Sequence, residues 1–244
     1  MRCVSAKFVP RLLTDEQKEN RVEISQELLA DANGNENFLK NIITGDETWV
    51  YGYDVETKIQ SSQWMGKGSP RPKKARLSRS KIKVMVVVFF DWKDIAHHEF
   101  EPRGQMVNKR LYQEVLARLR DAVRRKRHEL WENQTWMLHH GKAPAHASLL
   151  IRSYPAKHQT SVVSQPPYTL DLTPADFFLF PKLKTTLEGS HFQTIEEIQE
   201  NAIRELGAIT ESASRKHSNN GRNVGSGVSP VEGTTLKETV LKML

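Results

Sequence analysis

The chain has 244 residues, 38% of them hydrophobic, which is enough for one large domain or two small ones with a packed core. Lys and Arg number 36 against 29 Asp and Glu, so the formal net charge is +7, which favours polyanionic partners such as nucleic acid. The single cysteine, Cys3, excludes an intrachain disulfide and a Cys-based zinc cluster, and the longest apolar run, Val84 to Phe90, is far short of the roughly 20 residues that span a membrane.

The first element that we expect is a helix after Thr14. Thr14 and Gln17 have the three-residue spacing of a capping box, in which two side chains satisfy the backbone N–H groups at a helix start. Asn33-Gly34 is a typical helix end. A second, short helical segment is predicted around Phe38 to Ile42.

Two strands and a basic loop are predicted next. Residues 48–53 and 59–64 are rich in β-branched and aromatic side chains, which favour strands. Residues 67–83 contain two prolines, many basic side chains and no acid, and this composition indicates an irregular basic loop. Such a loop is either a solvated surface or a contact for a polyanion.

A buried strand and a long helix follow the loop. Lys83 to Asp91 is almost continuously apolar, too short for an isolated helix and bounded by charge, which predicts a strand buried on both faces at the centre of a sheet. A further strand is expected over Ile95 to Phe100. Asn108 is the predicted start of a helix with apolar residues at helical spacing, and that helix ends in the basic run Arg124 to Arg127.

The remaining pattern alternates short strands with helices. Strands are predicted over 135–138 and 161–164, with a helix after Pro144 between them and two more helices that begin near Pro174 and Thr194. With the preceding elements, this order indicates an α/β protein that has a mixed central sheet flanked by helices. It is the order of an RNase H-like fold.

Three carboxylates stand where active sites collect in such a fold. Asp46 lies near the start of the first strand, and Asp171 and Asp176 lie at the start of a helix. An acid at a helix start often does no more than cap it. Carboxylates at a strand and at a helix N-terminus can also converge on divalent cations, and two cations roughly 3.5–4 Å apart stabilise the attacking and leaving oxygens of a phosphodiester displacement.

Several motifs in this chain resemble the mariner transposase family. They are, in the family's order and spacing, ITGDETWVYGYD, SQW, GSPRPKKAR, HHEF, LHH followed by APAHAS, and PPYTLDLTPADFFLFPKLK, and the resemblance runs from about Val4 to Ala213. It implies an RNase H-like catalytic domain with an acidic triad that acts with Mg²⁺ to cut DNA at transposon ends and join it elsewhere. Asp46 matches the first catalytic, metal-binding acid of the triad, and Asp176 matches the third.

The chain departs from the family at the second acid. Between His140 and Ala143 the family has Asp-Asn, whereas this chain has Gly141-Lys142. The 34 residues between Gly141 and Asp176 keep the family's spacing, so the difference is a substitution and not a shift. It removes an oxygen ligand and adds an ammonium group, a change of about two charge units. We therefore expect weakened Mg²⁺ or Mn²⁺ binding and an impaired catalytic site.

Other side chains that could replace the lost ligand are less suitable. Glu47 follows Asp46 directly, so on a strand it points to the other face. Asp171 has a structural role by resemblance. An alternative metal site would use His139, His140 and His146, but Pro144 lies between the last two and no cysteine is nearby.

The resemblance also implies surfaces for DNA and for a second subunit. In the family, the basic loop projects between strands and touches DNA and the partner subunit. The DNA contacts expected here are Lys67, Arg71, Lys73, Lys74, Arg76, Arg79 and Lys81, which would bind phosphates and position the DNA without reading its sequence. The segment formed by Phe8, Val9, Pro10, Arg11 and Leu12 resembles the family's linker motif, which supports a homodimer.

We expect three segments with different roles. Residues 1–34 would be a remnant of the linker and dimerisation region, 35–211 the catalytic domain, and 212–244 a Ser-, Gly- and Asn-rich disordered tail. Family members carry helix-turn-helix modules before the linker, which this sequence is expected to lack. The partner expected is DNA, in the nucleus, with no membrane and no small-molecule substrate.

Three functions stay open on the sequence. The first is an inactive transposase catalytic domain that still binds DNA. The second is a metal-dependent nuclease or strand-transfer enzyme with a repaired site. The third is a domesticated, non-catalytic DNA-binding and dimerisation module.

Overall fold

The structure is a computed structural model that describes residues 12–55, 61–66, 68–70, 73, 78–101, 108–141, 143, 145–166 and 172–220, with side chains described as far as Ile209 in the last helix. Within these residues five strands form one sheet in the order β3-β2-β1-β4-β5. The strands are β1 Ile42–Tyr51, β2 Lys83–Phe90, β3 Ile95–Phe100, β4 Met137–His140 and β5 Ser161–Val162.

The sheet is mixed. Strand β2 pairs antiparallel with β1 and with β3, whereas β4 pairs parallel with β1 and with β5. The α/β class and the mixed sheet predicted from the sequence are therefore confirmed. The central strand is β1 and not the apolar strand β2, because β1 carries the parallel half of the sheet on its other edge.

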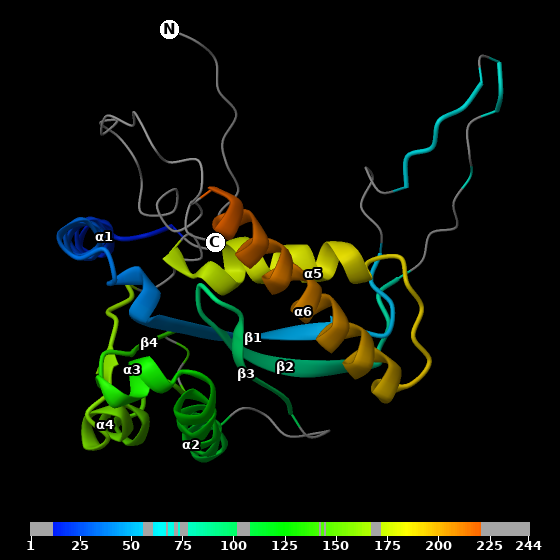
Figure 1. The fold of residues 1–244 in the computed structure, drawn as a ribbon. Helices are drawn as coiled ribbons and strands as arrows, with labels where there is room; N and C mark the ends of the chain where they lie inside the picture. The colour runs from blue at the N-terminus through cyan, green and yellow to red at the C-terminus, as the bar shows by residue number, and fades with distance from the viewer. Residues whose placement is uncertain are drawn as a thin grey trace, which may run out of the picture.

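Helices cover both faces of the sheet (Figure 1). On one face lie α2 Lys109–Lys126, α3 His128–Glu132 and α4 Leu149–Lys157. On the other lie α5 Phe180–Leu187 and α6 Ile195–Asn220, preceded by the short π-helical segment η3 Ala175–Leu179. Helix α1 Asp15–Gly34 and the 3-10 turn η1 Leu39–Asn41 lead into β1.

The apolar run of β2 serves two cores at once. Val84, Val86 and Val88 belong to the cluster shared with α5 and α6, whereas Val87 and Phe89 belong to the cluster shared with α2. Because successive side chains on a strand point to opposite faces, a strand covered by helices on both sides is apolar at every position. The predicted burial of this strand on both faces is confirmed.

Two helix starts follow from local signals in the amino-acid sequence. The capping box of Thr14 and Gln17 is present, with both hydrogen bonds formed, and α1 ends at Gly34. The side chain of Asn108 accepts hydrogen bonds from the backbone N–H groups of Arg110 and Leu111 at the start of α2. Both helices begin as predicted.

Other boundaries differ from the prediction. Residues 61–64 of the expected strand 59–64 are not in a strand, because β1 pairs instead with β2 and β4 and the Trp64 side chain is fully exposed. Strand β1 begins at Ile42 and not at residue 48, and β4 begins at Met137 and not at residue 135. Both starts coincide with the register of pairing between the two strands, Ile42 opposite Met137, which is a tertiary signal.

The last described helix, α6, is longer than predicted. Helix α6 runs past residue 212, where the disordered tail was expected to begin, and reaches Asn220. No Gly or Pro occurs between Ile209 and Gly221, so nothing local stops the helix before that point. The rest of the expected tail, 221–244, lies outside the described residues. Among the helices described here, none combines the length and the apolar composition that crossing a membrane requires.

Candidate functional site

Asp46, Asp176 and position 141 converge at one place on the sheet. Strand β1 pairs with β4 so that Gly45 lies opposite His140, which brings Gly141 beside Asp46. A Cβ atom added to Gly141 would lie 3.7 Å from Asp46 Oδ1, an ordinary van der Waals contact. Asp176 is in the first turn of η3, which packs against β1. The structure thus brings together the two predicted acids and the position where the second acid was expected.

The electrostatics of Asp46 show how crowded this place is with negative charge. Burial, together with the charges of Glu47 and Asp176, raises the pKa of Asp46 from 3.8 to about 7, although the Glu47 backbone N–H donates a 2.8 Å hydrogen bond to its Oδ1 and opposes the rise. Burial also raises the pKa of Asp176, against the opposing charge of Lys184. A cation held between the two carboxylates would relieve both penalties.

The residues present suit one hard cation better than two. Carboxylate oxygens are the ligands that Mg²⁺ and Mn²⁺ prefer, and Mg²⁺ is commonly held by one or two carboxylates with water and substrate phosphate completing its shell. Asp46 and Asp176 supply two carboxylates. A third carboxylate was expected at position 141, where the glycine side chain is only a hydrogen atom. Lys142 and Asp171 lie outside the described residues.

Glu47 is engaged by a histidine and also meets Asp46. The two residues pair with Val87 and Val88, which belong to different cores, so their Cβ atoms leave opposite faces of the strand. Their carboxyl groups nevertheless share a side-chain hydrogen bond, which raises the pKa of Asp46 and lowers that of Glu47. The Oε1 atom of Glu47 is 3.0 Å from His146 Nε2. Burial raises the pKa of Glu47, but the hydrogen bond and charge of His146 outweigh burial and leave that pKa lowered, so Glu47 is ionised in this pair.

The three histidines do not form a metal site. His139 Nδ1 lies 2.9 Å from Thr44 Oγ1, and burial lowers its pKa to about 4. His140 Nδ1 lies 2.9 Å from the Tyr112 hydroxyl, and burial lowers its pKa to about 3. His146 is committed to Glu47. The alternative of a histidine metal site is therefore wrong, and nowhere in the described part of the chain do three or more His, Cys, Asp or Glu side chains gather to hold a metal.

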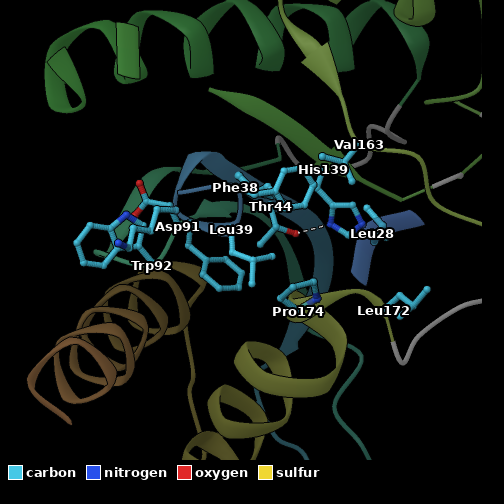
Figure 2. Close-up of a pocket in the computed structure, with 13 residues that line it drawn as sticks. Leu28, Phe38, Leu39, Thr44, Asp91, Trp92, His139, Val163, Leu172 and Pro174 are labelled. Atoms are coloured by element: carbon cyan, nitrogen blue, oxygen red, sulfur yellow. Dashed lines mark hydrogen bonds between the residues drawn. The ribbon is translucent and has the colours of Figure 1, made fainter. Parts of the chain in front are cut away.

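An apolar cavity lies close to the acids but is not a substrate site. Its volume is about 80 Å³, and Figure 2 shows Phe38 from the segment before β1, the hydrogen-bonded pair Thr44 and His139 from the sheet, and Pro174 from the start of η3 around it. Its one carboxylate, Asp91, is bound by Arg127. The cavity is a packing gap between the segment before β1 and the sheet.

The basic loop is described in part. Lys73 and Lys81 are exposed, and Arg79 is held at the end of β1, where its Nε atom is 2.8 Å from Asp54 Oδ1 and its guanidinium lies 4.5 Å from the Tyr51 ring centroid. Lys83 Nζ lies 4.0 Å from the Trp49 ring centroid, a contact that the sequence did not indicate. The other expected DNA contacts, Lys67, Arg71, Lys74 and Arg76, lie outside the described residues.

The expected dimerisation segment is almost entirely outside the described residues. Of its members only Leu12 is described, and its side chain is 86% exposed. Phe8, Val9, Pro10 and Arg11 stay predictions.

Sequence reasoning missed the role of His146 and Tyr112. His146 joins Glu47 to Gly141, and Tyr112 from α2 stacks on the His146 ring. His146 and Glu47 are 99 positions apart in the sequence, so no local pattern could have predicted their contact. The sequence offered one signal of a contact between His146 and Gly141, namely that His146 lies only five residues after Gly141.

Comparison with known proteins gives consistent matches in sequence. A family model described as a transposase (partial DDE domain) matches residues 54–133. The Mariner Mos1 transposase of Drosophila mauritiana is 29% identical over 194 residues, which are 79% of this chain and 55% of that protein. The Histone-lysine N-methyltransferase SETMAR of Homo sapiens is 29% identical over 200 residues, 82% of this chain and 28% of that protein. The chain therefore spans about half of the first relative and less of the second.

Solved structures agree with the sequence matches. The Mos1 mariner paired end complex with Mn has a TM-score of 0.71 at 25% identity over 91% of this chain and 68% of that one. The catalytic domain of Mos1 transposase has a TM-score of 0.64 at 24% identity over 86% of this chain and 97% of that one. The RNase H-like fold expected from the order of elements is confirmed by this likeness.

Proposed function

Because the chain belongs to the mariner family of transposases and contains their catalytic domain, we propose that it is a DNA strand-cleavage and strand-transfer domain whose divalent-metal site is impaired at position 141. Two of the Mos1 structures are paired end complexes with Mn and with Mg, which supports the choice of metal. When bound, the cation would activate the attacking oxygen and stabilise the leaving oxygen of the phosphodiester. Asp46 and Asp176 would hold it.

The observation that carries the proposal is the place of Gly141. The parallel pairing of β1 with β4 puts this residue beside Asp46, and a side chain there would point at the Asp46 carboxylate from van der Waals distance. An Asp at position 141 would complete a three-carboxylate set with Asp46 and Asp176. Glycine leaves two half-buried acids whose pKa values are raised and too few oxygens for a pair of cations.

The direct test is nicking of supercoiled plasmid DNA in Mg²⁺ or Mn²⁺. We expect the chain itself to be inactive or nearly so, and Gly141→Asp to gain metal-dependent nicking of at least about 10²-fold over the parent, since a metal-held site contributes several kcal/mol to such a reaction. Gly141→Asn is the matched control, because the Asn side chain has the size of Asp but carries no charge. This variant should stay inactive. Gly141→Asp combined with Asp46→Ala should lose the gained activity.

Two results would contradict this reading. Nicking by the parent that depends on Asp46 would mean that another group supplies the missing ligand. Failure of Gly141→Asp in a folded protein that still shifts DNA on a gel would favour the third function, a non-catalytic DNA-binding module.

DNA as partner is proposed on charge and likeness together. The net charge is +7, and the Mos1 relatives are solved in paired-end complexes, one of them with the left transposon end. Two exposed side chains, Lys73 and Lys81, suit contacts with backbone phosphates. Two aromatic rings with a cation beside them, Tyr51 with Arg79 and Trp49 with Lys83, suit stacked bases as well. Homodimerisation through residues 8–12 and a nuclear location are proposed with this function.

A further inference from the structure

We propose that His146 is a positioning residue, which holds the backbone of position 141 beside Asp46 and so sets the geometry of the metal site. The inference rests on the proposed function for its consequence, but the clamp itself is a feature of the chain as it stands. His146 does not lie on the sheet; it belongs to the turn that follows β4 and precedes α4.

Both ring nitrogens of His146 lie at hydrogen-bond distance from a partner. Nδ1 is 2.9 Å from the Gly141 carbonyl oxygen, and Nε2 is 3.0 Å from Glu47 Oε1. A backbone carbonyl only accepts hydrogen bonds, so Nδ1 donates to Gly141, while Nε2 bonds the Glu47 carboxyl group. The ring thus ties position 141 to the residue next to Asp46.

The His146 ring is locked in place by its surroundings. Its side chain is 2% exposed and that of Glu47 is 13% exposed. The Tyr112 ring stacks on it at a centroid distance of 3.8 Å. Tyr112 is itself fully buried in the core formed with β1, β2 and β4. A long helix, a central strand and the end of β4 thus meet at one ring.

This arrangement fixes a residue that strand pairing does not hold. Strand β4 ends at His140, so Gly141 is the first residue beyond the ladder. Its carbonyl is fixed by His146, and the same histidine is anchored to the residue next to Asp46 on β1. The distance between position 141 and Asp46 is consequently set by the span of one imidazole ring between Gly141 and Glu47.

The first experiment measures the clamp in the unmodified chain. His146→Phe keeps a ring to stack on Tyr112 and removes both N–H donors. We expect faster amide hydrogen exchange in peptides that cover residues 137–147, with a thermal melt that still shows a cooperative fold. The matched control is His158→Phe at the end of α4, where the histidine packs on Tyr154 away from the site, and it should leave this exchange unchanged. Unchanged exchange in His146→Phe would overturn the inference.

The second experiment measures the consequence for metal in the Gly141→Asp background. Loss of a residue that orients a metal ligand typically lowers metal affinity 10–100-fold. His146→Phe should therefore raise the half-saturating Mn²⁺ concentration about 10-fold or more. This concentration can be measured both by calorimetric titration and from the nicking rate. The nicking rate at saturating Mn²⁺ should fall much less. His146→Ala should recover when free imidazole is added, because the space left by the side chain adjoins a cavity of about 560 Å³ lined by His140, Gly141 and His146.

Equal Mn²⁺ affinity with and without His146 would overturn the positioning role. If Gly141→Asp itself gains neither Mn²⁺ binding nor nicking, the proposed function fails instead, and the exchange measurement on the unmodified chain still decides whether the clamp exists.

Discussion

Gly45 on β1 and Gly141 directly after β4 show how much one residue decides in this site. At Gly45 an added Cβ would lie 2.1 Å from Phe89 Cδ1, so only glycine allows Phe89 to fill the core under α2. At Gly141 an added Cβ meets nothing closer than 3.7 Å, so a larger residue fits there. The two positions look alike in a sequence, and only the register of β1 with β2 and β4 separates a structural requirement from a lost ligand.

A buried histidine makes the stability of the chain sensitive to acid. Burial lowers the pKa of His139 from 6.5 to about 4. Between pH 6.5 and pH 4, His139 therefore binds a proton in the unfolded chain but not in the folded chain. Stability from this residue is complete above pH 6.5 and is lost as the pH falls towards 4. The loss is about 3 kcal/mol in the free energy of unfolding.

Urea denaturation at pH 7 and pH 4 measures this loss. In His139→Asn the pH-dependent decrease should be smaller than in the parent by about 3 kcal/mol. The exposed His128 offers a control, since His128→Asn should leave the decrease unchanged. Parallel pH profiles of the parent and His139→Asn would show that His139 does not stay neutral when buried.

At the scale of elements, one buried ion pair joins the β2–β3 turn to the end of α2. Arg127 donates from Nε to Asp91 Oδ2 at 2.6 Å and from Nη2 to Asp91 Oδ1 at 3.1 Å, and the side chains are 5% and 0% exposed. Asp91 Oδ1 also accepts the backbone N–H groups of Lys93 and Asp94 and shapes the turn. This contact fixes α2, and with it Tyr112, relative to the sheet.

Arg127→Met should destabilise the chain by about 3–5 kcal/mol, because it leaves the Asp91 carboxylate buried without its partner. Arg124→Met breaks an exposed pair with Asp121 and should cost no more than about 1 kcal/mol. Adding Asp91→Asn to Arg127→Met should restore part of the loss, since the amide oxygen still accepts from the turn. Equal midpoints of thermal unfolding for the two arginine variants would contradict this account of the pair.

For the whole molecule, what could be predicted from sequence follows the range of each signal. The capping box of Thr14, the cap at Asn108 and the two-faced apolar strand β2 are local patterns, and all three are present in the structure. Strand β1 is different, because residues 42–47 include Gly45, Asp46 and Glu47, which are poor strand formers. All three are held by pairing with β2, and Gly45 also pairs with β4.

The residues of the site also differ in whether a sequence signal or only a tertiary contact identifies them. Asp46 and Asp176 could be proposed from motifs, and the resemblance to the mariner family, with its spacing preserved, indicated that Gly141 stands where that family has an acid. The pair of His146 with Glu47 and the stacking of Tyr112 could not, because those contacts join residues from three elements far apart in the chain. They exist only once the sheet has formed.

The central claim is that the fold keeps a place for two cations while the chain lacks one of the acids that would hold them. Calorimetric titration of Mn²⁺ into the parent and into Gly141→Asp, without DNA, tests it most directly. We predict weak binding by the parent and an affinity at least about 10-fold higher for Gly141→Asp, because a direct ligand should be worth no less than the residues that orient one. The gain should vanish when Asp46→Ala is added. Equal affinities in the parent and Gly141→Asp, with both proteins folded, would contradict the claim.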